Sequence, residues 1–215
     1  MVAHANAPQA PSEHSALPRR CAAVAAVFGG AAWTVKAAVT LATGDEPALA
    51  FAVGAALFPF ALLGLWSLVR SVDGRAGRIG GLLAAVAAVA VVLGLLVRAV
   101  GGSAVEGSED EVTVLTPFIA IAGMGTFAAL LALGLAVRRA GALAPGYASL
   151  PWAMGLAAIP LLMIGGALET VSERLLEVPI GLLGLGWIAL GTALWNQQAG
   201  LPTDRAPTPT PQEPG

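Results

Sequence analysis

The chain is poor in the residues that ligate metals and form cross-links: it has one cysteine and two histidines among 215 residues. A single cysteine, Cys21, cannot form a disulfide within the chain and cannot supply a cysteine-based metal site. Both histidines, His4 and His14, precede the first apolar segment, so no long apolar segment offers a histidine for haem or metal. We therefore expect neither a cofactor nor a metal site.

Catalytic sets are also missing from the apolar segments. None of these segments contains two acidic residues, and their hydroxyl side chains have no neighbouring base (Thr34, Thr40, Ser67, Thr126 and Thr192). Hydrolysis within a membrane needs paired carboxylates, an activated nucleophile or a metal. The hydroxyl groups are better explained as hydrogen-bond donors to their own helix or to a neighbouring one. The sequence favours a protein that is not an enzyme.

Charged residues make up only 11% of the chain, whereas 57% is hydrophobic and the mean hydropathy is +0.79. These values are typical of a polytopic membrane protein. Six segments have roughly the 20 apolar residues that a membrane-spanning helix needs. They are residues 21–43, 48–69, 79–97, 112–137, 152–168 and 179–195. We expect an all-α bundle of six transmembrane helices, and the composition, with ten arginines and one lysine, favours a bacterial source.

The domain organisation follows from the same segments. Residues 21–197 form one predicted transmembrane domain, and the first segment is expected to be a retained helix because its apolar stretch is too long for a signal peptide. Residues 1–20 and 198–215 are rich in Pro and small or polar residues, so we expect two disordered tails. Together these parts account for the chain and leave no length for a soluble domain.

Basic and acidic residues alternate between successive connections, as the positive-inside rule requires. Eight arginines fall on one side, which is therefore predicted to be cytoplasmic: Arg19, Arg20, Arg70, Arg75, Arg78, Arg138, Arg139 and Arg205. Nine acidic residues fall on the other side: Asp45, Glu46, Glu106, Glu109, Asp110, Glu111, Glu169, Glu173 and Glu177. We expect a plasma (inner) membrane protein with both termini in the cytoplasm.

Two prolines lie inside predicted helices, Pro59 in the second and Pro160 in the fifth. Proline removes a helical hydrogen bond, so we expect a kink at each position. Residues 169–177 are predicted to continue the fifth helix as a polar extension with leucines on one side. The many glycines favour close packing within the bundle over a dedicated oligomer face.

Lys36 is the one ionisable residue well inside an apolar segment, and such a residue suggests a functional site. It lies seven residues, roughly 10 Å, from the outer end of its helix. Glu169 ends the fifth segment at a similar depth, so we predict that these two residues form an intramembrane polar pair. Two alternatives stay open: Lys36 extends outward along its own stem, and Glu169 is simply interfacial.

The leading functional expectation is a non-enzymatic accessory or scaffold component of the membrane. The alternative is a small solute or ion permease or channel that uses Lys36 and Glu169. A permease should have a water-accessible polar path past Lys36, whereas a scaffold should have a packed interior. We expect the lipid bilayer as a partner and no nucleic acid, and a protein partner or homo-oligomer stays open.

Overall fold

A computed structural model describes residues 16–72, 74–102 and 113–199. The two predicted tails lie largely outside these residues, and the acidic segment 106–111 does so entirely. The described chain forms six α-helices and a short 3-10 helix, η3, and it contains no strand. The helices are α1 (Ala16–Thr43), α2 (Ala48–Val69), α3 (Arg75–Gly101), α4 (Thr116–Ala140), α5 (Leu150–Glu169) and α6 (Glu177–Ala199).

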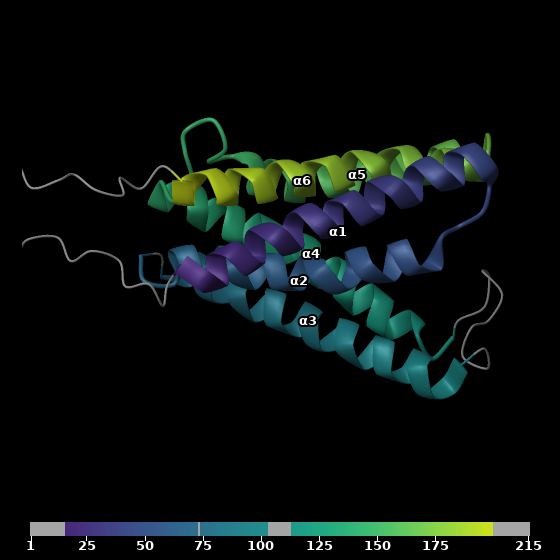
Figure 1. Cartoon of the computed structure of the whole chain (residues 1–215), viewed down its shortest axis with the longest axis horizontal. Coiled ribbons are helices and arrows are strands. Elements are labelled where there is room, and N and C mark those ends of the chain that lie inside the picture. Colours follow the sequence, from purple (N-terminus) through teal and green to yellow (C-terminus); the bar gives the residue numbers. More distant parts are fainter. Residues whose placement is uncertain (1–15, 73, 103–112, 200–215) are drawn as a thin grey trace, which may run out of the picture.

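All six helices are long and apolar enough to cross a membrane, and the all-α prediction is confirmed. Figure 1 shows that they run up and down along one long axis. The start of α1 and the end of α6 consequently lie at the same end of the bundle. Large apolar side chains, such as Phe28, Leu82 and Met163, are exposed on the outside of the bundle. An apolar exterior is what a helix bundle surrounded by lipid presents.

The charged side chains separate to the two ends of the bundle. One end, called the arginine end below, carries Arg19, Arg20, Arg70, Arg75, Arg78, Arg138 and Arg139. The opposite end, called the acidic end, carries all the acidic residues of the described chain: Asp45, Glu46, Glu169, Glu173 and Glu177. Arg98 and Arg174 are also at the acidic end.

Helix α1 packs against both α2 and α6, and α3 packs against α4. Glycines allow α1 and α6 to approach closely: a Cβ atom on Gly30 would lie 2.5 Å from the carbonyl oxygen of Gly184 and 2.8 Å from the amide nitrogen of Ile188. Lipid gives helices no hydrophobic reason to associate, so backbone contact of this kind stabilises the pair through van der Waals packing. At the acidic end, α3 and the start of α4 diverge from the α1–α6 pair (Figure 1).

The prediction that residues 169–177 extend the fifth helix is wrong. Helix α5 ends at Glu169, Ser172 is extended (φ −161°, ψ 128°), and η3 (Glu173–Leu176) leads into α6. Pro179 favours a helix start just before it, because proline costs least in the first turn, where its missing N–H would have no helical partner. The chain therefore starts a new helix, and Glu177 becomes its first residue.

Both interior prolines lie in helices that continue through them. Pro59 of α2 is fully buried, whereas Pro160 of α5 is exposed. The kinks expected at these residues stay a prediction.

Candidate functional site

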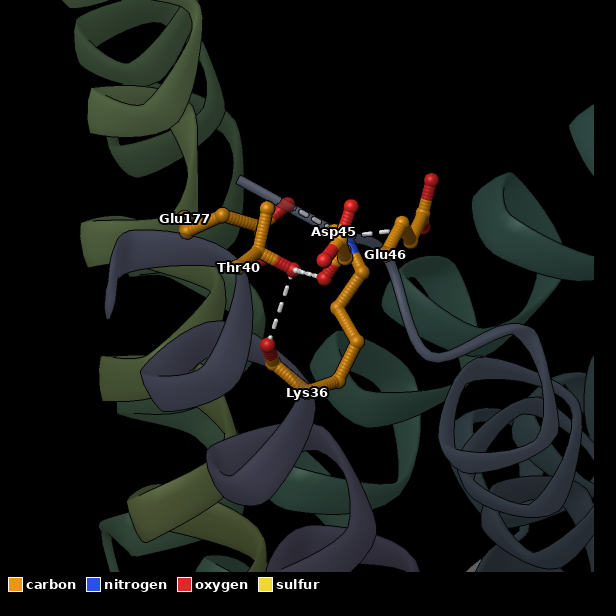
Figure 2. A network of polar contacts seen from close by, with 5 residues as sticks. All are labelled: Lys36, Thr40, Asp45, Glu46 and Glu177. Atoms are coloured by element: carbon orange, nitrogen blue, oxygen red, sulfur yellow. Dashed lines mark hydrogen bonds and ion pairs between the residues drawn. The ribbon is translucent and has the colours of Figure 1, made fainter. Parts of the chain in front are cut away.

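Lys36 is buried near the acidic end of α1, with 4% of its surface exposed. Its Nζ forms an ion pair with Oε1 of Glu177 and lies 2.9 Å from Oε1 of Glu46. Figure 2 shows the ammonium group between these two carboxylates, which come from α6 and from the turn after α1. A buried cation needs such partners, because an isolated charge out of water is strongly destabilising.

The predicted partner of Lys36 is therefore wrong. Glu169 is exposed at the last residue of α5, whereas the lysine is paired with Glu177 and Glu46. Two features explain the difference. The helix α1 packs against α6, and the break after α5 places Glu177 at the first turn of that helix.

The turn between α1 and α2 positions Glu46 over the lysine. The Thr40 hydroxyl donates to the carbonyl oxygen of Lys36 (3.0 Å) and to that of Asp45 (3.4 Å), which ties the turn to the last part of α1 (Figure 2). Gly44 has a positive φ of 84°, which glycine adopts readily. The guanidinium of Arg174 lies against this turn, since a Cβ atom on Gly44 would be 2.7 Å from its Nη2.

Glu177 is the more deeply enclosed of the two carboxylates. It is 5% exposed, whereas the side chain of Glu46 is 52% exposed. As the first residue of α6, Glu177 also benefits from the positive end of the helix dipole. Its Oε2 is buried and accepts no hydrogen bond from the described part of the chain. The cluster thus joins α1, α6 and the turn after α1 through buried charge, with Glu177 as its central anion.

Sequence reasoning missed Glu177 and Glu46 as partners. A signal for each is visible in the sequence: Glu177 stands two residues before a proline that starts a helix, and Glu46 follows a glycine turn directly after the lysine's own helix. Both places bring a carboxylate to the level of Lys36 along the bundle. Depth alone could not distinguish these residues from Glu169.

An aromatic cluster lies directly beside the ion pairs. Lys36 Nζ is 6.0 Å from the centre of the Phe51 ring, and Phe51 stacks on Trp33 with 6.2 Å between ring centres. Trp33 meets Phe58 edge to face at 4.9 Å, and Phe58 stacks on Trp187 at 4.3 Å. These four rings connect α1, α2 and α6 between the acidic end and the middle of the bundle.

A cavity of about 240 Å³ adjoins the aromatic cluster on the side of α3 and α4. Its lining is largely apolar and comes from α1, α2, α3, α4 and α6, together with Leu115 just before α4. Among the described lining residues, Arg98 is the one that is charged, and Lys36 does not line the cavity. No motif in the sequence predicts this cavity, because its walls combine residues from five different helices.

Comparisons of the chain with protein-family models, with curated proteins and with solved structures found no match. The ion pairs and the cavity are therefore the basis for any functional inference.

Proposed function

We propose that the protein is a non-enzymatic, multi-pass component of a bacterial plasma membrane, with an accessory or scaffold role. One observation carries this proposal: Lys36 is held in a buried ion pair with Glu177 that connects α1 to α6. A lysine in that setting fixes the register of the helices that its ion pair joins, which is the best-attested use of buried ionic groups. Close glycine contacts between the same two helices support the same structural role.

The permease alternative depends on Lys36 facing a polar path. With 4% of its surface exposed and both carboxylates in contact with its ammonium group, this residue has little access to water. The cavity beside it has a largely apolar lining, and neither Lys36 nor Glu169 is among the described residues that line it. A hydrated solute or ion would lose its water in such a cavity and gain few polar partners in return. These observations favour the scaffold role.

A flux measurement tests this choice. Purified protein in proteoliposomes is expected to pass K⁺, Cl⁻ and protons no faster than protein-free vesicles, because the cavity between the described helices has a largely apolar lining. An added pore-forming peptide serves as the positive control for vesicle integrity. A flux in the wild type that disappears in the Lys36→Met variant would overturn the scaffold proposal in favour of a permease.

The proposed orientation places the arginine end in the cytoplasm and the acidic end outside, so that both termini are cytoplasmic. The separation of charge between the two ends supports it, because basic residues are retained on the cytoplasmic side. Ser149 and Ser172 are exposed residues in connections at opposite ends, before α5 and before η3. They give two matched positions for labelling.

We expect Ser172→Cys, in a Cys21→Ala background, to react with a membrane-impermeant maleimide on intact spheroplasts. Ser149→Cys should react only after the membrane is permeabilised, because its connection faces the cytoplasm. The measurement is the labelled fraction of each variant before and after permeabilisation. Equal labelling of the two cysteines on intact spheroplasts, or the reverse order, would refute the proposed orientation.

A further inference from the structure

The cavity near the acidic end lies between α2 and the α3–α4 pair, where Figure 1 shows α3 and the start of α4 diverging from the rest of the bundle. An apolar cavity of about 150 Å³ in a soluble protein is enough to bind benzene. The cavity here, at about 240 Å³, has room for a longer piece of hydrocarbon. On α4 and the residue just before it, the lining runs from Leu115 to Phe127, which corresponds to about 18 Å of helix. The space is therefore elongated along the membrane normal.

The walls have the chemistry of a hydrocarbon site. Small residues, including Ala55, Ala90 and Gly123, leave the space open, and the rings of Trp33 and Trp187 line its deep side. The indole nitrogen of Trp33 lies against α2 at Gly54, where an added Cβ atom would touch it, so this donor is directed at a helix. Thr126 and Trp33 also bring polar groups to the lining, and the buried indole N–H of Trp33 has no hydrogen-bond partner within the described residues. Apart from Arg98, the rest of the described lining is largely apolar, so an acyl chain meets mostly apolar wall.

Two lining residues show that the cavity reaches the outside of the bundle. Leu95 of α3 is 40% exposed and Ile119 of α4 is 55% exposed, although both also line the cavity. In a bilayer these side chains face lipid hydrocarbon. A lipid chain can therefore enter from the side without crossing a polar surface.

The charge at the cavity selects the headgroup. Arg98 lies in the last turn of α3, at the level where headgroups begin if α3 spans the membrane. A guanidinium group offers fork-like donors that match a phosphate or carboxylate. Phosphatidylcholine offers the same phosphate but adds a choline cation, which gains nothing from a guanidinium group, so the charge of Arg98 favours a headgroup that is anionic as a whole.

We infer that this cavity is a binding site for one acyl chain of an anionic phospholipid, with the lipid phosphate at Arg98. The hydrocarbon chain lies along α4 and contacts the aromatic cluster. The second chain of the same lipid stays outside, against the exposed faces of Leu95 and Ile119. The site lies beside the Lys36–Glu177 pair and does not use it.

The test is native mass spectrometry of the full chain in micelles that contain phosphatidylglycerol and phosphatidylcholine with identical acyl chains. The wild type is expected to retain one phosphatidylglycerol molecule with about tenfold preference, equivalent to about 1.4 kcal/mol, because both lipids offer Arg98 a phosphate but only phosphatidylcholine brings a cation close to the guanidinium. Arg98→Gln should reduce the preference to near unity while some lipid is still retained. Equal retention of both lipids by the wild type would overturn the headgroup assignment.

Gly123→Leu tests the acyl chain directly, because Gly123 lines the cavity and a Cβ atom there meets nothing within 4 Å. This variant should fold and lose the retained lipid. Gly166→Leu is the matched control, since Gly166 is a helical glycine of α5 that is equally open but does not line the cavity. Ala122→Leu, a second filling variant, should behave as Gly123→Leu does.

Retention that is unchanged in both filling variants would overturn the site.

A competition experiment with palmitate identifies the source of the acyl chain. If palmitate at equal concentration displaces phosphatidylglycerol from the wild type and Gly123→Leu abolishes palmitate binding, the phospholipid assignment is wrong and the ligand is a free fatty acid. If phosphatidylglycerol stays bound, the phospholipid assignment is supported.

Discussion

Replacing Lys36 with methionine is expected to lower the free energy of unfolding by about 3 to 5 kcal/mol, the range for breaking a buried ion pair from one side. The reason is Glu177, which would remain 5% exposed at the start of α6 without its cation. Methionine is close to lysine in length and apolar, so the loss of packing should be small. The measurement is reversible unfolding of the purified protein by SDS in mixed micelles.

Glu169→Gln is the control for this experiment, because Glu169 is an exposed carboxylate at the same end of the bundle. A surface substitution away from buried contacts changes stability by less than about 0.5 kcal/mol. If Lys36→Met and Glu169→Gln lowered the free energy of unfolding equally little, Lys36 would have no structural role in the bundle.

The second large effect is expected from Gly30→Ala. The added Cβ atom would lie 2.5 Å from the Gly184 carbonyl oxygen and 2.9 Å from the Trp187 Cβ atom. Backbone atoms of α6 cannot move aside like the end of a long side chain, so α1 and α6 must separate. Overpacking of a core costs typically about 1 to 3 kcal/mol, and a backbone obstacle belongs at the upper end of that range. Unfolding in mixed micelles measures this loss as well.

Gly166→Ala provides the comparison for that substitution. A Cβ atom at Gly166 meets nothing within 4 Å, and alanine is favoured over glycine in a helix by up to about 1 kcal/mol. The control should therefore be neutral or slightly stabilising. Equal stability of the two variants would show that α1 and α6 do not pack as closely as described.

The sequence was sufficient for the helices and for the separation of charge, because both depend on local composition. Six apolar segments of spanning length are visible without any knowledge of packing, and their connections alternate between arginines and acids. The interior of α6 shows the limit of such reasoning. Its close contacts with α1 use Gly184 and Gly191, seven residues apart on one helix face, and this spacing does not form a Gly-xxx-Gly motif.

The partner of Lys36 could not be predicted because two different quantities decide it. Membrane depth, which the sequence gives approximately, admits both Glu169 and Glu177. Helix adjacency, which the sequence does not give, favours Glu177 because α6 packs on α1. Because residues 169–177 were expected to be helical, the sequence did not indicate the turn that brings Glu177 to the start of α6. The cavity was invisible for the same reason, since it arises only from the arrangement of five helices.

The most direct test of the ionic connection between α1 and α6 is a pair of double-mutant cycles. Lys36→Met is combined once with Glu177→Gln and once with Glu169→Gln, and the free energy of unfolding is measured for every single and double variant. We expect a coupling energy of about 1 to 3 kcal/mol for Lys36 with Glu177 and additivity within about 0.5 kcal/mol for Lys36 with Glu169. Additive effects for Lys36 with Glu177, or coupling confined to Glu169, would contradict the account.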